Sequence, residues 1–232
     1  GLDIINLSVG EPDFNTPDHI KEAAKKAVDD NFSRYSPVPG YPALREAICA
    51  KLKNENGLDY SPAQISCSNG AKQCVCNAVM ALAGKGDEVI IPAPYWVSYP
   101  QMVLLADATP VYIEAGIEQD FKITPEQLEA AITPATRAII LCSPSNPTGV
   151  VLNQESIETV ATVLREKSEA YGHPIYLIAD EPYRELVYGN TQVPYLPLFY
   201  KNTIVCYSFS KSLSLPGERI GYILISPEAE AV

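Results

Sequence analysis

Histidine is scarce in this chain of 232 residues, which contains only His19 and His173. Both lie close to prolines, and neither belongs to an HExxH or similar metal-binding motif. Metal catalysis and a catalytic triad built on histidine are therefore unsupported by the sequence. If the protein performs acid–base chemistry, we expect a residue other than histidine to carry it.

Basic charge is also in short supply, because 17 Lys and Arg residues face 28 Asp and Glu residues and the net charge is −11. A surface this acidic repels nucleic acid and anionic membranes, so we expect neither as a partner. No apolar run approaches the roughly 20 residues of a membrane span. The first residues show no basic region followed by an apolar block, so we expect no signal peptide.

Two further kinds of motif are missing. The sequence has no GxxxxGKS/T phosphate loop, and no predicted strand is followed by GxGxxG. Its six cysteines form no CxxC pair, and we interpret them as buried, reduced thiols of a cytoplasmic protein. Hydrophobic residues make up 47% of the chain, which is enough for a substantial core in one large domain or two small ones.

Helical and extended patterns alternate along the chain. Threonine-proline pairs at Thr16 and Thr124 predict the starts of two helices. Near-continuous apolar runs between the helices are typical of strands covered on both faces, so we expect an α/β fold with a mostly parallel sheet and helices on both faces. The predicted helices are Pro17–Asp30, Pro42–Asn56, Ala71–Ala83, Ser98–Ala106, Thr124–Ile132 and Gln154–Gly172, and the predicted strands are Ile65–Cys67, Glu88–Ile91, Pro110–Ile113, Ala138–Cys142, Ile175–Ala179 and Thr203–Tyr207.

Chemically distinctive residues follow five of these strands. Ligands of open α/β sheets bind outside the carboxyl ends of the strands, so we expect these segments to form one polar site with a flat aromatic wall. In chain order the segments are "SNGAKQ", "PAPYWVSY", "SPSNPTG", "DEPY" and "SFSK".

Each of these features alone has a plain structural explanation. The glycine turn at Gly70 suits a phosphate, but such a turn also simply joins a strand to a helix. Asp180 could cap a helix or pair with a buried cation, and a lone lysine such as Lys211 is usually a solvated surface residue. Trp96 could belong to the core. Their joint occurrence at strand ends favours a binding site.

The stretch "SFSKSLSLPGERIGY" resembles the lysine signature of the class I aminotransferases, fold-type I enzymes that use pyridoxal 5′-phosphate (PLP). Six other blocks resemble signatures of the same family in the same order, and the likeness is strongest to its bacterial aspartate-aminotransferase-like branch. These blocks are "SVGEPDF", "RYSPVPGYPALREAI", "NGAKQ", "PYWVSYP", "SPSNPTG" and "ADEPY". The resemblance covers the whole chain and implies a seven-stranded, mostly parallel sheet.

The resemblance implies roles for the charged residues. Lys211 would form a Schiff base with PLP, and its freed amine would move a proton between the substrate's Cα and the cofactor. That amine must be neutral to act, and a dry site with a cationic neighbour lowers the pKa of a lysine. Arg219 would supply this positive field while it grips the phosphate. Asp180 would pair with the pyridine nitrogen and keep it protonated.

The resemblance assigns the remaining contacts as well. Tyr183 and Asn146 would bind the phenolic oxygen of the ring, and Trp96 would stack on its face. Gly10, with Trp96 and Asn146, would contact the substrate. The phosphate cup would consist of Gly70, Ala71, Lys72, Ser208 and Ser210. Tyr35 would reach the phosphate of a neighbouring subunit, which implies a homodimer with shared sites.

The resemblance also implies a domain organisation and an activity. Residues 1–232 correspond to the cofactor-binding large domain, with residues 1–16 near the substrate entrance, and the family's C-terminal small domain is absent from this sequence. The implied reaction moves an amino group between an aspartate-like or aromatic L-amino acid and a 2-oxo acid such as 2-oxoglutarate. The alternatives are a PLP-dependent C–S lyase or other elimination enzyme on the same scaffold, and a non-catalytic PLP-binding fragment.

Overall fold

The computed structural model describes residue 5 and residues 10–230, and within them a seven-stranded sheet organises the chain. The strand order is β1-β7-β6-β5-β4-β2-β3, and all strands run parallel except β7, which is antiparallel to both of its neighbours. The expected α/β fold with a mostly parallel sheet is thus confirmed. The strands are β1 (Ile65–Ser68), β2 (Glu88–Ala93), β3 (Thr109–Glu114), β4 (Thr136–Cys142), β5 (Tyr176–Asp180), β6 (Thr203–Ser208) and β7 (Gly221–Ile225).

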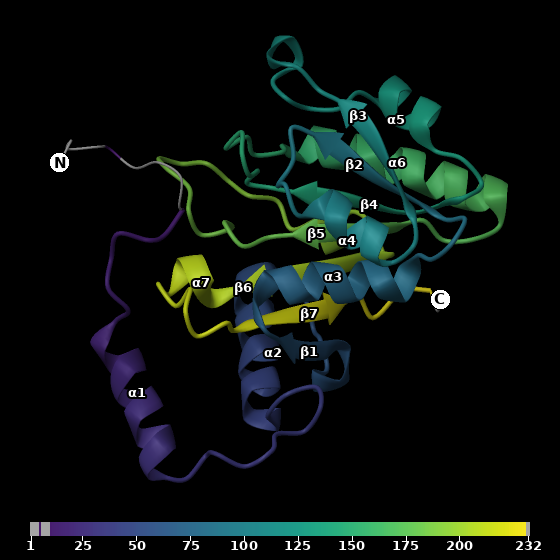
Figure 1. Cartoon of the computed structure of the whole chain (residues 1–232). Coiled ribbons are helices and arrows are strands. Elements are labelled where there is room, and N and C mark those ends of the chain that lie inside the picture. The colour runs from purple at the N-terminus through teal and green to yellow at the C-terminus, as the bar shows by residue number, and fades with distance from the viewer. Residues whose placement is uncertain (1–4, 6–9, 231–232) are drawn as a thin grey trace.

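Helices cover both faces of this sheet, as expected (Figure 1). Helices α3 and α4 pack on one face, and α2, α5 and α6 pack on the other. The helices are α1 (Asp18–Asp29), α2 (Pro42–Asn56), α3 (Gly70–Leu82), α4 (Tyr99–Leu105), α5 (Pro125–Ala131), α6 (Gln154–Tyr171) and α7 (Phe209–Ser212), with 3₁₀ turns at Pro62–Gln64, Ile117–Gln119 and Leu196–Leu198.

The alternation of side chains along β5 explains why its sequence is apolar throughout. Tyr176 and Ile178 pack in the core beside α3 and α4, whereas Leu177 and Ala179 pack in the core on the opposite face. Because successive residues of a strand point to opposite faces, Asp180 continues the row of Tyr176 and Ile178. The carboxylate therefore lies on the α3 and α4 side of the sheet.

One of the two predicted threonine caps is correct. Thr124 forms a capping box with Gln127, whose amide nitrogen donates to the threonine hydroxyl and whose side-chain oxygen accepts from the Thr124 amide. At α1 no side chain caps the first turn. The Thr16 hydroxyl, which the sequence predicted to cap α1, instead donates to the Ser214 carbonyl at 2.6 Å.

Two elements near the lysine signature were not predicted from periodicity. The strand β7 has only five residues, and the helix α7 has only four. The stretch between β6 and β7 contains no helix long enough to show periodicity, so the alternation of helices and strands does not mark β7. The pairing of β6 with β7 places Ser208, the first residue of "SFSK", opposite Gly221 of "RIGY".

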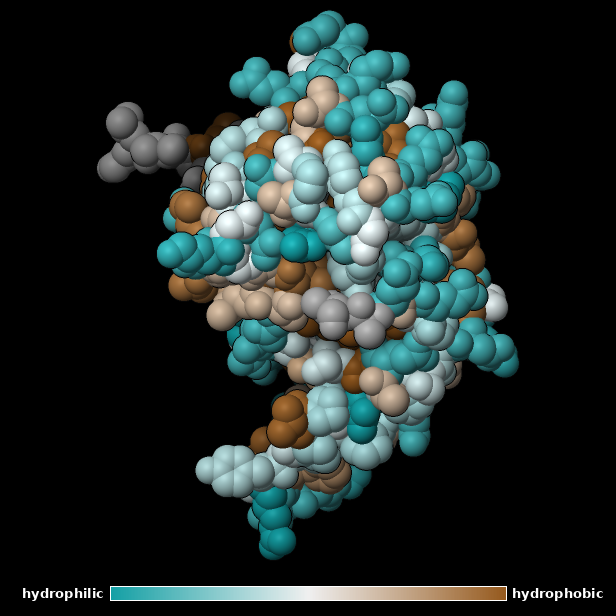
Figure 2. All heavy atoms as spheres, turned by 90° about the vertical axis from the view of Figure 1, so that its right-hand side faces the viewer, coloured by the Kyte–Doolittle hydropathy of each residue, from teal (hydrophilic) through white to brown (hydrophobic). Residues whose placement is uncertain are grey.

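Helix α1 stands apart from the rest of the molecule (Figure 1) and buries none of its residues. Apolar side chains in and after it are exposed, among them Val28, Phe32 and Tyr35. At the end of the sheet opposite to α7, the surface consists largely of hydrophilic residues with small apolar spots (Figure 2). No described helix combines the length and the apolar character that crossing a bilayer requires.

Candidate active site

The predicted site residues come together where β5 and β6 end beside the first turns of α3 and α4. Asp180 ends β5, and Ser208 ends the neighbouring strand β6, whose next four residues form α7 with Lys211. The starts of α3 and α4 supply Gly70 and Tyr99. This is the edge of the sheet at which the order and direction of the strands predict a ligand.

Asp180 is a buried carboxylate, and only one of its two oxygens has a partner among the described residues. Its exposed fraction is 4%, and its Oδ2 accepts a hydrogen bond from the Tyr99 hydroxyl at 2.6 Å. Its Oδ1 is buried and has no partner among the described residues. Burial raises the pKa of this carboxyl to about 7, against a lowering effect of the Tyr99 bond. A protonated ring nitrogen is the kind of donor that this free oxygen lacks.

Lys211 presents its amine to the same region. The Nζ atom donates a hydrogen bond to the Gly10 carbonyl and lies 5.9 Å from the centroid of the Tyr183 ring. Partial burial lowers the pKa of this amine, the charge of Arg219 lowers it further, and Glu11 opposes both. The direction agrees with the expectation from the sequence, although burial contributes more than the cationic neighbour.

Two serines hold the helix that carries the lysine. The Ser208 hydroxyl caps α7 by accepting from the Ser210 amide at 3.1 Å, and the two hydroxyl oxygens lie 2.8 Å apart. The sequence placed both serines in a phosphate cup. In the structure they are buried beside the first turn of α7 and fix its start.

Glycine allows Arg219 to approach the first turn of α3. Gly70 has φ of +77°, and a Cβ at this position would lie 2.5 Å from Nη2 of Arg219. The guanidinium donates to the carbonyl oxygens of Asn69 at 3.4 Å and Pro216 at 2.9 Å. A helix start with free N–H groups beside a guanidinium fits a phosphate. Ala71, the next residue of α3, is buried.

A second close approach supports the same turn. A Cβ on Gly221 would lie 2.5 Å from the Tyr207 carbonyl oxygen and 2.8 Å from the Gly70 carbonyl carbon. Only glycine lets β7 pass this close to both β6 and the start of α3. Gly221 was not predicted from the sequence as a residue of the site, although the "RIGY" segment contains it.

Aromatic and amide side chains border the site. The amide of Asn146 donates to the Tyr183 hydroxyl at 3.4 Å. Trp96 meets Tyr99 edge to face, with ring centroids 5.5 Å apart. The Nζ of Lys72 lies 5.1 Å from the centroid of Trp96, so the lysine expected in the phosphate cup lies against the aromatic wall.

The structure does not bring every predicted residue to the site. Tyr35 is fully exposed in the segment after α1, and its role toward a neighbouring subunit stays a prediction. Of the segment 1–16, residues 1–4 and 6–9 lie outside the described part of the chain, whereas Gly10 contacts Lys211. Two residues that influence the site, Tyr99 and Glu11, were not predicted from the sequence. Tyr99 could have been found as a tyrosine at the start of a helix that follows a strand, and Glu11 as the acid next to Gly10.

The donors and acceptors assembled here fit PLP. A buried carboxylate oxygen without a partner suits a ring nitrogen that carries a proton, and the start of α3 with Arg219 suits a phosphate. The Lys211 amine follows β6, the strand beside β5, and partial burial lowers its pKa, which favours the neutral form that attacks an aldehyde as a nucleophile.

Comparison with known proteins points the same way. Residues 2–232 match the family described as Aminotransferase class I and II. The chain is 48% identical over 227 residues to an aspartate/prephenate aminotransferase of Cereibacter sphaeroides, which covers 96% of this chain and 55% of that protein. It is 45% identical over 227 residues to an aspartate aminotransferase of Geobacillus stearothermophilus, with 96% and 56% covered.

Solved structures show the same fold. An amino transferase from Eubacterium rectale superposes with a TM-score of 0.92 at 39% identity, covering 96% of this chain and 57% of the other. The aspartate aminotransferase of Thermus thermophilus with maleate gives 0.87 at 38% identity, with 95% and 56% covered. The chain spans about half the length of the curated relatives it matches.

Proposed function

Because this chain belongs to the class I and II aminotransferase family, we propose that the protein is a PLP-dependent aminotransferase. It moves an amino group between an aspartate-like or aromatic L-amino acid and a 2-oxo acid such as 2-oxoglutarate. One observation carries the proposal: neighbouring strands deliver a lysine amine of lowered pKa and a buried carboxylate with an unpaired oxygen to the same site. The names of the relatives, aspartate and prephenate aminotransferases, support this substrate class.

The residues around the site divide the work of binding the cofactor. When bound, PLP supplies an electron-poor ring that accepts the electron pair released at the substrate's Cα. Asp180 holds the proton on the ring nitrogen, and Asn146 with Tyr183 binds the phenolic oxygen. Arg219 and the first turn of α3 bind the phosphate, with Gly70, Ala71, Ser208 and Ser210 around it. Trp96 covers the ring face, with Lys72 beside it.

Lys211 has two tasks in this proposal. Its Nζ would hold the cofactor covalently through the aldehyde carbon, whose oxygen would leave as water. The free amine would take the proton from the substrate's Cα. Partial burial lowers its pKa, against an opposing effect of Glu11 and with a smaller lowering by Arg219, and the net lowering raises the fraction of neutral amine at physiological pH.

The assembly and the compartment are part of the same proposal. A second copy of the chain brings Tyr35 to the phosphate, so the protein works as a homodimer. We place this homodimer in the cytoplasm. Residues 1–232 act as the cofactor-binding large domain, with residues 1–16 near the substrate entrance. The part of the relatives that this chain does not span corresponds to the small domain.

Chemical trapping tests the proposal directly. The purified chain is incubated with PLP, reduced with borohydride and digested, and the modified peptide is identified by mass spectrometry. We expect the label on Lys211 and no label on that peptide in Lys211→Ala. A label elsewhere in wild type, or an equal label in the variant, would refute the assignment of the lysine.

The reaction type needs a separate assay. A panel of amino acids is supplied with 2-oxoglutarate, and glutamate is measured against pyruvate plus ammonia. Glutamate formation supports amino transfer, and pyruvate with ammonia would assign the protein to the elimination enzymes on this scaffold. PLP capture without turnover of any amino acid would leave a PLP-binding chain without activity of its own.

A further inference from the structure

A chain of polar contacts lies behind the lysine, on the face of the sheet opposite to Asp180. Tyr207 is buried in the core beside α2, whereas its neighbours Cys206 and Ser208 point toward the α3 side. The Tyr207 ring stacks on Tyr222 with centroids 5.0 Å apart and meets Phe209 edge to face. The ring is therefore held firmly, and its hydroxyl has a fixed position.

That hydroxyl links α7 to a carboxylate. It donates to Oε1 of Glu185 at 2.7 Å and lies 3.0 Å from Oγ of Ser212. A phenol has one proton, which goes to the carboxylate, so the Ser212 hydroxyl donates to the phenolic oxygen. Burial raises the pKa of Tyr207 and Glu185 raises it further, so the phenol keeps its proton.

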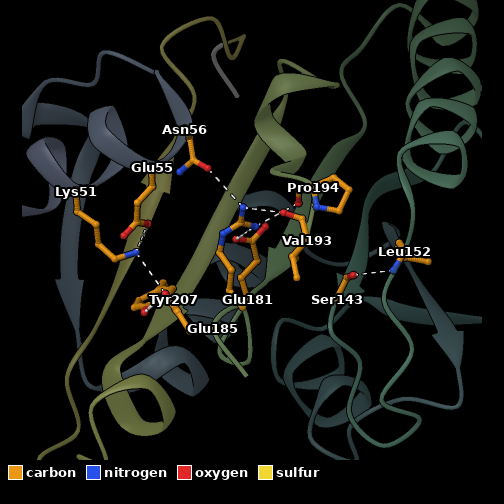
Figure 3. A network of polar contacts seen from close by, with 11 residues as sticks. Lys51, Glu55, Asn56, Ser143, Leu152, Glu181, Glu185, Val193, Pro194 and Tyr207 are labelled. Atoms are coloured by element: carbon orange, nitrogen blue, oxygen red, sulfur yellow. Dashed lines mark hydrogen bonds and ion pairs between the residues drawn. The ribbon is translucent and has the colours of Figure 1, made fainter. Parts of the chain in front are cut away.

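The carboxylate is in turn anchored to α2. Nζ of Lys51 lies 3.4 Å from Oε1 of Glu185, 2.6 Å from Oε2 of Glu55 and 5.0 Å from the centroid of the Tyr207 ring. Figure 3 shows Lys51, Glu55, Glu185 and Tyr207 gathered at one place between α2 and the end of the sheet. The contacts run from Ser212 through Tyr207 and Glu185 to Lys51 on a long helix.

Helix α7 depends on such anchors because it is too short to hold itself. It has four residues, and an isolated turn is unstable in water. The Ser208 cap holds its first turn, and the bond from Ser212 to Tyr207 holds its last residue. Lys211 lies between these two anchors, next to Ser212.

We propose that Ser212, Tyr207 and Glu185 are positioning residues that fix α7 and so aim the Lys211 amine at the Gly10 carbonyl and the Tyr183 ring. They touch neither the substrate nor the cofactor and act only through the lysine. The role deepens the proposed function and rests on it, because a fixed amine matters most to a protein that captures an aldehyde and moves a proton. The opposite face of the sheet thereby supports the site.

The experiment measures the lysine itself in the PLP-free chain. The rate at which an amine-reactive reagent labels Lys211 is followed against pH by mass spectrometry, and each variant is also tested for PLP trapping by borohydride. In Tyr207→Phe the ring stays and only the hydroxyl is lost. We expect α7 to loosen, the amine to become more solvated and its labelling pKa to rise by about half a unit to one unit. Labelling at a fixed pH below that pKa then slows roughly three- to tenfold.

Matched variants separate positioning from general stability. Tyr200→Phe also removes a buried tyrosine hydroxyl, which donates to the Ile175 carbonyl at 2.6 Å, but this residue lies before β6 at the other end of that strand. We expect Tyr200→Phe to destabilise the chain without moving the labelling pKa. Ser212→Ala should shift the labelling pKa as much as Tyr207→Phe does, whereas Ser212→Thr, which keeps the hydroxyl, should keep the wild-type labelling pKa. The double variant Tyr207→Phe/Ser212→Ala should show no larger shift than either single variant.

The outcomes are distinct. An unchanged labelling pKa in both Tyr207→Phe and Ser212→Ala would overturn the positioning role, as would an equal shift in Tyr200→Phe. If the wild-type chain fails to capture PLP at Lys211, the proposed function fails, and the labelling profiles still decide whether this chain of contacts holds the lysine. If PLP is captured and the profiles do not differ, only the positioning role fails.

Discussion

Two neighbouring residues, Asp180 and Glu181, are buried carboxyls on opposite faces of the sheet. Burial raises the pKa of each to about 7, and each has one oxygen without a partner among the described residues. Of the two, only Glu181 forms an ion pair within the described part of the chain, since Nη1 of Arg184 lies 3.4 Å from its Oε2. The end of β5 is therefore costly to bury, and a ligand with a donor removes part of that cost at Asp180.

Asp180→Asn should change how stability depends on pH. A carboxyl whose folded pKa is raised contributes stability that is complete below its unfolded pKa near 4 and is lost as the pH rises to about 7. Urea unfolding between pH 5 and 8 should thus show a free energy of unfolding that falls up to about pH 7 in wild type and falls less in the variant. The difference should be up to roughly 3 kcal/mol over the two units between pH 5 and pH 7.

Repeating the urea unfolding with added PLP tests whether Asp180 contacts the cofactor. If the ring nitrogen donates to Asp180, the cofactor should flatten the wild-type profile and leave the profile of Asp180→Asn unchanged in slope. Identical slopes in the two proteins without PLP would contradict the assignment of a raised pKa to this carboxyl.

Gly221 is the residue at which backbone spacing matters most. In Gly221→Ala the new Cβ would meet backbone atoms of Tyr207 and Gly70, which cannot move aside as a flexible side chain can. We expect a loss of about 1–3 kcal/mol in the free energy of unfolding, measured by urea titration, together with weaker PLP binding. Gly84→Ala is the control, because a Cβ there meets nothing within 4 Å. Equal losses in the two variants would show that the close approach does not matter.

At the scale of the elements, α5 offers a clear test of local sequence signals. Thr124→Ala removes the hydroxyl that accepts from the Gln127 amide and should destabilise the chain by about 1 kcal/mol. Thr16→Ala acts differently, because Thr16 bonds to the Ser214 carbonyl and not to α1. We expect circular dichroism to show no loss of helix in Thr16→Ala, and a loss equal to the content of α1 would contradict this assignment.

The elements predicted well from sequence belong to the alternation of helices and strands. Helix α2 was predicted with its observed ends, and the bounds of α3 to α6 and of β1 to β6 were predicted to within a few residues. The strands β1 and β5 are no longer than β7, but each follows a predicted helix, whereas only the four-residue helix α7 lies between β6 and β7. Short elements outside that alternation are defined by their partners, and partners are not visible in a single sequence.

The site was predicted to a similar extent and for a similar reason. Asp180, Asn146 and Lys211 could be placed at one edge of the sheet because each follows a predicted strand. The bond from Tyr99 to Asp180 could not be predicted, because it depends on how α4 packs over β5. The contact between Ser212 and Tyr207 depends likewise on the turn between β6 and α7.

At the scale of the whole molecule, the exposed apolar residues around α1 need a partner. Helix α1 buries no residue, and Val28, Phe32, Tyr35 and Val38 are exposed in a chain that otherwise has a well-packed core. The chain is also strongly acidic, with a net charge of −11, so a partner seated on α1 must gain enough apolar contact to offset charge repulsion between two copies. The homodimer proposed above would bury this region and would bring Tyr35 to the second site.

Tyr35→Phe tests that arrangement. If the hydroxyl of Tyr35 reaches the phosphate in the partner's site, its loss should weaken PLP retention in the dimer by roughly ten- to 150-fold, because one hydrogen bond to a charged group is worth about 1.5–3 kcal/mol. Retention is measured by dialysis and absorbance, and the oligomeric state by sedimentation at several protein concentrations. Tyr188→Phe serves as the control, since Tyr188 is also a highly exposed tyrosine and lies after β5, far along the chain from α1. A monomer that retains PLP as tightly as wild type, or equal effects of the two substitutions, would rule out the shared site.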